Sequence, residues 1–438
     1  MKIYFIGIKG SGMSALAQLI KDLGYNVLGS DVNKIFFTDQ KLFEKNILVL
    51  PFDEKNIDKN IDYIILGNAF DEDNIEVKKA KELKIPIIKY YDCLNYLSKK
   101  FDSIAICGTN GKTTTTSMIT TIFPENETNY IIGDGHGHGH VDANKFIFEA
   151  CEYKNTFLNY KPKTTIITNI EMDHPDFFNS IDDVINSYQQ FADKSAVLII
   201  NDDDQNIKKI KHKDIFTFSL KNEKANVYMK ITEEKSEYFE FHLYFNQNNI
   251  GEFNLPFVGT HMIYNSLAAL TLGLYYQESI VDIINNLKNF KGAKRRFEIY
   301  EFEEQDIYLI DDYAHHPTSI KYTLDAIRKK YPDYQLTCFF QAHTFSRVEI
   351  FHEEFAKNLA IADNIYIDQV FGSIRENNGK IDEKILLEDL KIYDKKILNN
   401  YKEIKNIGPK QVIVLLGAGD IDVNLIPKIK ECINEINN

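Results

Sequence analysis

The stretch DSIAICGTNGKTTTTSMITTIF, residues 102–123, decides the fold class of this chain. A short apolar run passes through two glycines into a segment with helical spacing, which is the strand–turn–helix unit of a parallel α/β sheet. Lys112 and Thr113 end the turn, where an ammonium can reach nucleotide phosphates and a hydroxyl can ligate magnesium. Only two residues separate Gly108 from Gly111, whereas the usual phosphate loop has four between its glycines. The pattern alone therefore predicts a nucleotide site and leaves a plain glycine turn with an exposed lysine open.

The same alternation of strand and helix continues in both directions from this stretch. Before the stretch, the alternation is seen in KIYFIGI, SGMSALAQLIKDLGY and NVLGSD. After the stretch, it is seen in FIFEACE, TTIITNI and AVLIIND. Between about residues 215 and 258, YFEFHLYF is typical of antiparallel hairpin strands. A third α/β series runs through YLIDDYAHH, LTCFFQAH, NIYIDQVF and QVIVLLGAGD. We predict an α/β protein of three domains, at residues 1–98, 99–299 and 300–438.

Length and composition are those of a folded protein with several domains. The chain has 438 residues, 44% of them hydrophobic and 26% charged, so it can bury sizeable cores. Its formal net charge of -13 argues against general binding to nucleic acid. Five scattered cysteines without a CxxC pair suit reduced thiols. No stretch has the length of a signal-peptide core or a membrane span, so we expect a cytoplasmic protein without membrane insertion.

A second glycine turn, GIKGSGM at residues 7–13, follows the first predicted strand. Gly7, Gly10 and Gly12 let the backbone approach an anion at the start of a helix. Lys9 occupies the middle glycine position of the dinucleotide fingerprint, although Asp31 closes the second strand where an acid often meets a ribose. A dinucleotide-binding fold and a turn without any ligand both remain open at this point.

Motifs along almost the whole chain resemble the Mur ligases of peptidoglycan precursor synthesis. They are GTNGKTTTT, FEACEY, ITNIEMDHPDFF, GTHMIYNSLAA, FKGAKRRFE, DDYAHHPTSI, FQAHTFSR and LLGAGDI, in the family's order. The resemblance implies an N-terminal Rossmann-like domain for a UDP-sugar, a central P-loop ATPase-type domain and a C-terminal Rossmann-like domain for an amino acid. GIKGSGM and DDYAHHP are most similar to the members that join L-alanine to UDP-N-acetylmuramate.

The resemblance implies a reaction in which ATP activates the sugar carboxylate as an acyl phosphate. Such a step brings several negative charges together, so cations must neutralise them. By family position, Thr113 and Glu149 hold one magnesium ion, and Glu149 and His174 hold a second ion. The residues assigned to ATP are Gly108, Thr109, Asn110, Gly111, Lys112, Thr113, Thr114, His261, Asn265, Arg296, Asp312 and His315.

The other two substrates are assigned to the outer domains. The residues assigned to the UDP-sugar are Gly7, Lys9, Gly10, Ser11, Gly12, Met13 and Asp31. Those assigned to the amino acid are Tyr313, His343 and Arg347, and the catalytic set is Lys112, Glu149, His174 and Arg347. Guanidinium groups bind phosphate and carboxylate oxygens in pairs, so Arg347 is assigned to the alanine carboxylate. The sequence leaves open whether Arg295 or Arg296 contacts phosphate.

Two departures from the family pattern are visible. Met262 stands where the family usually has asparagine, which puts the role of that position in question. Gln189 and Gln190 stand where other Mur ligases have a carbamylated lysine, which agrees with the alanine-adding members.

The segment GDGHGHGH, residues 133–140, is unusual in composition. A strand would place His136, His138 and His140 on one side, as a transition-metal site requires, but alternating glycines weaken a strand. No cysteine or second histidine cluster lies near in sequence to complete a tetrahedral set. We expect a flexible loop bordering the substrate cleft, with a metal site as the alternative.

Three other functions remain open at this stage. A relative could join a recycled murein peptide to the same UDP-sugar, and a folylpolyglutamate-type ligase is disfavoured by the N-terminal glycine turn. A nucleotide-responsive binding protein without ligase activity and a dinucleotide oxidoreductase are the non-ligase alternatives. We expect a monomer or weak homodimer with ATP, UDP-N-acetylmuramate, L-alanine and two magnesium ions as ligands.

Overall fold

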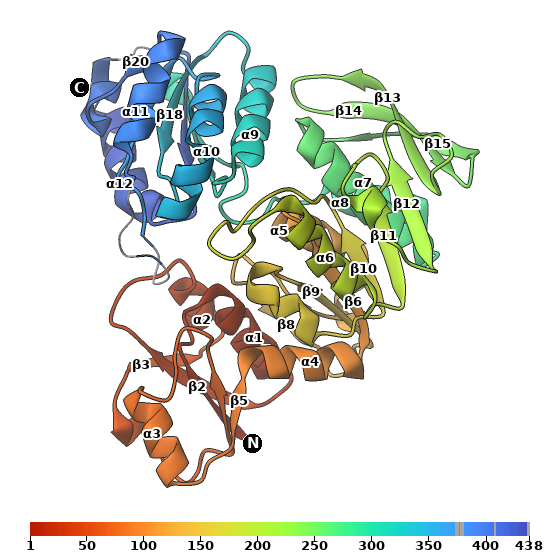
Figure 1. Cartoon of the computed structure of the whole chain (residues 1–438), viewed down its shortest axis with the longest axis vertical. Helices are drawn as coiled ribbons and strands as arrows, with labels where there is room; N and C mark the ends of the chain where they lie inside the picture. The colour runs from red at the N-terminus through yellow and green to blue at the C-terminus, as the bar shows by residue number, and fades with distance from the viewer. Residues whose placement is uncertain (373–375, 377–380, 407–408, 436–438) are drawn as a thin grey trace.

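The computed structural model describes residues 1–372, 376, 381–406 and 409–435. These residues form three sheets, each covered by helices, and the sheets follow one another along the chain (Figure 1). The predicted three-domain α/β architecture is confirmed. The boundaries proposed at 98/99 and 299/300 fall within α4, Tyr90–Lys100, and β16, Glu298–Phe302. Among the described residues, no helix combines the length and apolar character needed to cross a membrane.

The N-terminal sheet has five parallel strands in the order β3-β2-β1-β4-β5. Their bounds are β1 Lys2–Ile6, β2 Asn26–Asp31, β3 Leu48–Pro51, β4 Tyr63–Leu66 and β5 Ile87–Lys89. The helices are α1 Ser11–Asp22, α2 Asp39–Glu44 and α3 Ile75–Glu82. Alternate residues of β1 enter two cores, with Phe5 in one and Tyr4 in the other, as expected for a parallel sheet covered on both faces.

The central sheet has ten strands in the order β15-β14-β13-β12-β11-β10-β6-β9-β7-β8. Its strands up to the hairpins are β6 Asp102–Cys107, β7 Thr128–Ile131, β8 Gly137–His138, β9 Lys145–Glu149, β10 Thr164–Ile167, β11 Val197–Asn201 and β12 Ile215–Ser219. The antiparallel extension predicted from YFEFHLYF is confirmed as β13 Val227–Glu234, β14 Phe239–Phe245 and β15 Asn248–Leu255. The helices after α4 are α5 Lys112–Thr120, α6 Ile181–Ala192, α7 Thr260–Tyr275 and α8 Ile280–Lys288.

The C-terminal sheet has six strands in the order β16-β17-β21-β18-β19-β20. Only its edge strand β16 is antiparallel to its neighbour. The remaining strands are β17 Ile307–Asp312, β18 Gln335–Phe340, β19 Asn364–Ile367, β20 Lys396–Ile397 and β21 Gln411–Leu416. The helices are α9 Pro317–Lys330, α10 Phe345–Leu359, α11 Lys384–Leu390 and α12 Ile421–Asn434.

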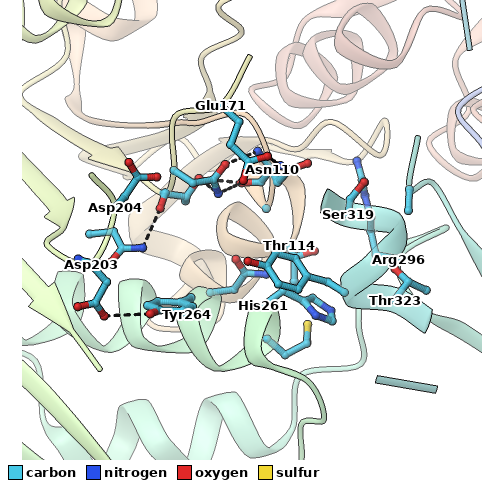
Figure 2. Close-up of a pocket in the computed structure, with 18 of the residues that line it drawn as sticks. Asn110, Thr114, Glu171, Asp203, Asp204, His261, Tyr264, Arg296, Ser319 and Thr323 are labelled. Atoms are coloured by element: carbon cyan, nitrogen blue, oxygen red, sulfur yellow. Dashed lines mark hydrogen bonds between the residues drawn. The ribbon is translucent and has the colours of Figure 1, made fainter. Parts of the chain in front are cut away.

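The central and C-terminal domains meet around a pocket of about 250 Å³. Its walls come from the turn between β6 and α5, from the start of α7, and from α9 of the C-terminal domain (Figure 2). In open α/β sheets, ligands bind beyond the carboxyl ends of the parallel strands. The pocket begins at that end of β6, so the fold places residues of two domains at one ligand position.

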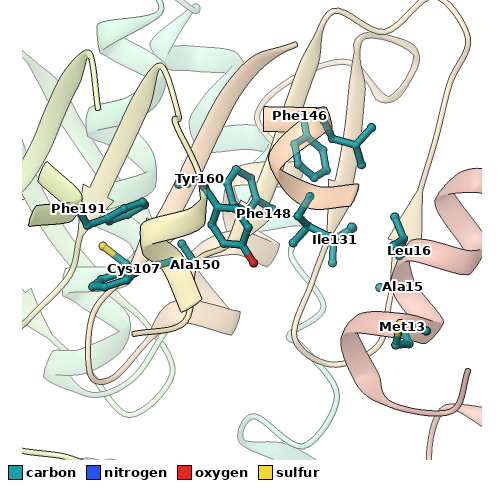
Figure 3. Close-up of a cluster of buried hydrophobic side chains, with 14 of the residues drawn as sticks. Met13, Ala15, Leu16, Cys107, Ile131, Phe146, Phe148, Ala150, Tyr160 and Phe191 are labelled. Atoms are coloured by element: carbon teal, nitrogen blue, oxygen red, sulfur yellow. The ribbon is translucent and has the colours of Figure 1, made fainter. Parts of the chain in front are cut away.

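The N-terminal and central domains share a hydrophobic core. Met13, Ala15 and Leu16 of α1 belong to the same buried cluster as Ile131 and Phe146 of the central sheet (Figure 3). Because the cluster is continuous between the two sheets, α1 packs against the edge of the central sheet as well as against the N-terminal sheet.

The segment 133–140 lies at this shared core, and part of the predicted loop is a strand. Gly137 and His138 form β8, which pairs antiparallel with β7. Gly135, Gly137 and Gly139 are buried, and a Cβ at Gly137 would overlap the carbonyl oxygen of Ala15 in α1. The alternating glycines therefore let a strand lie directly against a helix backbone.

The histidines of the segment are held by aromatic and acidic neighbours. His138 stacks on Tyr130 with a ring separation of 5.3 Å, and its Nδ1 lies 3.7 Å from Asp22 and 3.6 Å from Glu125. Among the described residues, the only group of ligands spaced for a metal ion lies elsewhere, at Glu152, Asp173 and His174. The alternative of a histidine metal site at residues 136–140 thus has no support in the fold.

Gly137→Ala is expected to destabilise the protein by about 1–3 kcal/mol, because overpacking against a helix backbone forces the two elements apart. The measurement is the free energy of unfolding in denaturant. A second variant replaces His136, His138 and His140 by serine, and we expect the ligation predicted from the sequence to stay within a few-fold of the parent. A stoichiometric transition metal in untagged protein, or ligation lost in this second variant and restored by zinc, would contradict this interpretation.

Candidate active site

The turn at residues 108–111 connects β6 to α5 and adopts a backbone that requires glycine. Gly108 and Gly111 have φ values of 138° and 83°. A Cβ at Gly108 would overlap the hydroxyl of Thr168, and one at Gly111 would lie 2.5 Å from Oδ1 of Asn265. The turn therefore carries its backbone close to neighbouring elements and opens onto the amino end of α5, where unpaired amides favour an anion.

Lys112 begins α5, and its ammonium turns back over the turn. Its Nζ donates to the carbonyl of Gly108 at 2.6 Å and to both carboxylate oxygens of Glu152 at 3.1 Å. Burial opposes the charge of Lys112, but Glu152 outweighs it and holds the pKa of the lysine above its usual value. The ammonium is therefore charged and forms a buried ion pair with Glu152.

Thr113 and Glu149 face each other next to this lysine. The Thr113 hydroxyl donates to Glu149 at 3.1 Å, and Arg296 donates to the same hydroxyl oxygen at 3.1 Å. Burial raises the pKa of Glu149, partly offset by a hydrogen bond from the amide of Gly133. A hydroxyl and a carboxylate are the hard oxygen donors that magnesium prefers, so these two side chains fit the predicted ion.

A second group of ligands surrounds His174. Ligand atoms of Glu152, Asp173 and His174 all lie within 4.8 Å of one another. Glu149, which the family pattern pairs with His174 at a second ion, is outside this group, whereas Glu152 and Asp173 were not assigned from the sequence. The sequence offered a signal for both residues, because Glu152 follows Glu149 in FEACEY and Asp173 precedes His174 in MDHP.

Arg347 of α10 reaches across the domain boundary to this group. Its Nε donates to Oδ1 of Asp173 at 2.7 Å and its Nη2 to Oδ2 at 3.2 Å, with 3% of the arginine side chain exposed. Although burial raises the pKa of Asp173, Arg347 and His174 hold it well below its usual range. Nη1 of Arg347 lies 3.0 Å from Nδ1 of His343. The predicted amino-acid clamp thus also ties the C-terminal domain to the central one.

The turn after β17 supplies the other predicted residues of the C-terminal domain. Asp312 accepts hydrogen bonds from the amides of Phe297 and Ala314, so its carboxylate organises the local backbone. His315 lies 2.9 Å from the carbonyl of Tyr313 and 5.9 Å from the ring of His343. Burial lowers the pKa of His315 well below its usual value, so the imidazole is neutral.

The pocket beside the turn contains His261 and Asn265 of α7 (Figure 2). Asn265 accepts from the hydroxyl of Thr115 at 3.2 Å, which fixes it beneath the turn. Burial lowers the pKa of His261 to about 4, and its Nδ1 is buried without a hydrogen-bond partner among the described residues. Its ring stacks on Tyr322 of α9 at 5.8 Å. Met262, where the family has asparagine, also lines the pocket.

Arg295 and Arg296 point in different directions. Arg295 is buried, donates to the carbonyls of Gly417 and Gly419, and lies 3.4 Å from Asp311. Arg296 is half-buried, contacts Thr113 and lines the pocket. Arg296 therefore faces the pocket and Arg295 does not, so Arg296 stays the candidate for a phosphate contact.

Arg295→Ala is expected to reduce the stability of the protein, and Arg296→Ala is expected to reduce its affinity for nucleotide. Losing Arg295 leaves Asp311 buried without its cation, so we expect a loss of about 3–5 kcal/mol of stability. Losing Arg296 should weaken nucleotide binding about 10- to 150-fold, since a hydrogen bond to a charged group contributes about 1.5–3 kcal/mol. Denaturant unfolding and calorimetry with a non-hydrolysable ATP analogue separate the two. Equal effects of both variants on nucleotide affinity would contradict the assignment.

The predicted UDP-sugar residues lie at the amino end of α1. Gly7 has a φ of 82°, its amide donates to the carbonyl of Ser30, and the amide of Lys9 donates to Asp31 at 2.7 Å. Met13 is buried in the core shared with the central domain. Ser11 begins α1, and Gly12 lies against Tyr90 of α4, where a Cβ would be 2.5 Å from the phenol oxygen. Asp31 and Lys9 therefore shape this turn together.

The two glutamines of α6 do not face the candidate site. Gln189 contacts Asp193 and the backbone of Lys211, and Gln190 is exposed. Tyr188 is the residue of this turn that points inward and is fully buried. Gln189 and Gln190 therefore lie away from the candidate site, and their comparison with the lysine of other Mur ligases stays a prediction.

Three solved structures share this fold along the whole chain. The UDP-N-acetylmuramate-alanine ligase MurC of Thermotoga maritima is 24% identical, with 100% of this chain and 99% of that chain covered and a TM-score of 0.82. A murein peptide ligase from Psychrobacter arcticus is 20% identical, with coverages of 99% and 98% and a TM-score of 0.71. A pseudomurein peptide ligase type C from Methanothermus fervidus is 19% identical, with full coverage of both chains and a TM-score of 0.69.

Family models match each of the three domains in turn. Residues 2–102 match the Mur ligase family catalytic domain, residues 106–273 the Mur ligase middle domain, and residues 295–420 the Mur ligase glutamate ligase domain. The matches follow the order of the three sheets and together leave few residues uncovered. The chain therefore belongs to the Mur ligase family.

Proposed function

We propose that this Mur ligase joins L-alanine to the carboxylate of UDP-N-acetylmuramate with hydrolysis of ATP to ADP and phosphate. The observation that carries the proposal is that Lys112 of the central domain and Arg347 of the facing domain pair with acids of one cluster. Lys112 pairs with Glu152 and Arg347 with Asp173, and ligand atoms of these two acids lie within 4.8 Å of each other. A phosphate-binding turn and an arginine suited to a carboxylate then meet at one place, as an ATP-dependent ligation requires.

The first chemical step is transfer of the γ-phosphoryl group to the sugar carboxylate. A carboxylate oxygen attacks the γ-phosphorus, the bond to the β-phosphate oxygen breaks, and ADP leaves. Lys112 and Arg296 place positive charge beside the phosphates, and the amides at the start of α5 bind their oxygens. Magnesium, for which Thr113 and Glu149 are the fitting donors, supplies charge neutralisation between the phosphates when it is bound.

The second step forms the amide. The neutral amine of the amino acid attacks the acyl carbon, the bond to the phosphate oxygen breaks, and phosphate leaves with the electron pair. The amide nitrogen gives up one proton in this step, and the departing phosphate takes it. Arg347 would bind the carboxylate of the amino acid, with the imidazoles of His315 and His343 nearby. In this proposal, His261 and Asn265 contact the adenine, and the turn at residues 7–13 binds the UDP-sugar.

Because its substrates are ATP and a sugar nucleotide, we propose a cytoplasmic reaction of peptidoglycan precursor synthesis by a monomer or weak homodimer. A second candidate function is ligation of a murein peptide to the same sugar, since the fold of a murein peptide ligase covers 99% of the chain. The two candidates differ only in the amine that attacks the acyl phosphate.

The test is phosphate release with ATP, magnesium and UDP-N-acetylmuramate, measured against L-alanine, glycine, L-serine and the peptide L-alanyl-γ-D-glutamyl-meso-diaminopimelate. Release that depends on L-alanine, with the amide product seen by mass spectrometry, supports the proposal. Release that depends only on the peptide supports the second candidate. No release with any amine, despite nucleotide binding, would indicate a nucleotide-responsive binding protein.

A further inference from the structure

Glu76 is a fully buried acid of the N-terminal domain. It lies in the first turn of α3 and has no solvent exposure. Within the described part of the chain, every group that donates to its carboxylate is a neutral hydroxyl or amide. A buried charge is strongly disfavoured unless hydrogen bonds or a cation compensate it. Hydrogen bonds therefore have to hold this acid in place.

The donors to Glu76 come from several segments of the domain. Oε1 accepts from the hydroxyl of Tyr4 in β1 at 3.0 Å, from the backbone amide of Asp53 at 3.2 Å and from the side-chain amide of Asn56 at 2.8 Å. Oε2 accepts from the hydroxyl of Ser30 in β2. Both oxygens accept, as in an ionised carboxylate, and the amino end of α3 favours a negative charge. Glu76 therefore fixes Ser30 relative to β1 and to the segment after β3.

Ser30 connects this carboxylate to the turn at residues 7–13. Its carbonyl accepts from the backbone amides of Gly7 at 2.9 Å and Ile8 at 3.1 Å. Gly7 also packs closely against Phe70, because a Cβ at Gly7 would lie 2.3 Å from that ring. The first residues of the turn are thus bound to Ser30 and packed against Phe70, so a shift of Ser30 would displace them.

The charge of Glu76 and its hydrogen bonds have opposite expected effects on an anionic ligand of this turn. A buried negative charge close to phosphates repels them, whereas a correctly placed turn presents the free amides at the start of α1 to them. A single residue, Ser30, links Glu76 to the turn, so both effects are expected there. The sign of the change caused by a neutral substitution therefore distinguishes a positioning role from a purely electrostatic one.

On the basis of the proposed function, we propose that Glu76 is a positioning residue for the sugar nucleotide. Because it is fully buried, it contacts no substrate itself. By holding the Ser30 hydroxyl it fixes the Ser30 carbonyl, which fixes the amides of Gly7 and Ile8 and the entry of the chain into α1. The diphosphate of the UDP-sugar then meets amides that are already in position, so less ordering is needed when it binds.

Glu76→Gln keeps the shape of the side chain and removes its charge. Calorimetry of the full-length protein with UDP-N-acetylmuramate should show binding weakened at least about tenfold, because the displaced turn no longer presents all of its amides to the diphosphate. The affinity for a non-hydrolysable ATP analogue should be unchanged. Unchanged or tighter binding of the UDP-sugar by folded Glu76→Gln would overturn the proposal.

Tyr4→Phe is the matched control for stability. It removes another donor from the same carboxylate and leaves the contact with Ser30 in place. Denaturant unfolding should show that both variants are less stable than the parent, whereas only Glu76→Gln should bind the UDP-sugar more weakly. Equal weakening of binding in the two variants would mean that Glu76 acts only through the stability of the domain, and the positioning role would be wrong.

Ser30→Ala tests the same link with a smaller change, in case Glu76→Gln does not fold. It should also weaken binding of the UDP-sugar at least about tenfold. The double variant Ser30→Ala/Glu76→Gln should bind no more weakly than the weaker single variant, since the two residues act through one hydrogen bond. Unchanged UDP-sugar affinity in Ser30→Ala, or additive effects in the double variant, would overturn the proposal.

Hydrogen exchange separates this inference from the proposed function, because it needs no ligand. In the free protein, the amides of Gly7 and Ile8 should exchange at least about tenfold faster in Ser30→Ala and Glu76→Gln than in the parent or in Tyr4→Phe. Unchanged exchange in Ser30→Ala and Glu76→Gln would overturn the proposal. Faster exchange, together with no binding of the UDP-sugar by the parent, would support the link from Glu76 to the turn and count against the proposed function instead.

Discussion

Replacing Lys112 by alanine is expected to abolish ligation, with a fall in turnover of at least about 10²- to 10³-fold. Its ammonium lies over the phosphate turn, 2.6 Å from the carbonyl of Gly108, and carries the charge that the attacking and leaving oxygens require. Binding of UDP-N-acetylmuramate should be largely intact, because the turn at residues 7–13 belongs to another domain. Calorimetry with the UDP-sugar and phosphate release measure the two properties separately.

Glu152 complicates this variant and also supplies its control. Lys112→Ala leaves the buried carboxylate of Glu152 without a cation, which is expected to destabilise the central domain. Lys112→Ala/Glu152→Gln removes the unpaired charge, so it should regain stability and remain inactive. Unchanged turnover in either folded variant would show that the turn at residues 108–113 does not bind the phosphates of ATP.

Arg347→Ala is expected to raise the KM for alanine about 10²- to 10³-fold and to change the KM for ATP far less. Truncation of one partner in a buried, hydrogen-bonded charge pair typically costs about 2–5 kcal/mol, which corresponds to changes of this size. The effect should fall on the amino acid because the guanidinium is assigned to its carboxylate. Initial rates with each substrate varied in turn provide the measurement.

The ion pair between Arg347 and Asp173 requires a comparison, because Arg347→Ala also cuts a contact between domains. Asp173→Asn weakens that contact and leaves the guanidinium in place. If Arg347 binds alanine, Asp173→Asn should raise the KM for alanine much less than Arg347→Ala does. Equal changes in the two variants, or equal changes for alanine and ATP, would mean that Arg347 acts only by joining the domains.

Much of the fold could be predicted because local patterns determine it. Apolar runs ending in glycine turns gave the parallel strands, and the alternation in YFEFHLYF gave the antiparallel hairpins. The glycine turn proposed to bind phosphate was recognisable because two positive φ values, at Gly108 and Gly111, leave little choice of residue. Lys112, Thr113 and Glu149 then meet because β6 and β9 are neighbouring parallel strands.

Contacts between domains account for what the sequence could not show. Arg347 and Asp173 are 174 positions apart, so no spacing rule connects them, and the different surroundings of Arg295 and Arg296 depend on a turn more than 120 residues further along the chain. The glycines at 135, 137 and 139 indicated mobility when considered alone. In the fold they are buried, because α1 and its neighbours in the N-terminal domain pack against them.

The contact between β8 and α1 also constrains how this chain can change over generations. Most interfaces adapt when a side chain becomes smaller or changes rotamer. Here Gly137 packs against the main chain of Ala15, and a substitution at Ala15 does not remove main-chain atoms. A descendant that acquires any side chain at Gly137 must also move α1, and α1 carries the turn at residues 7–13. A mutation at Gly137 would thus shift the proposed UDP-sugar site, at residues 7–13, relative to the glycine turn at residues 108–111.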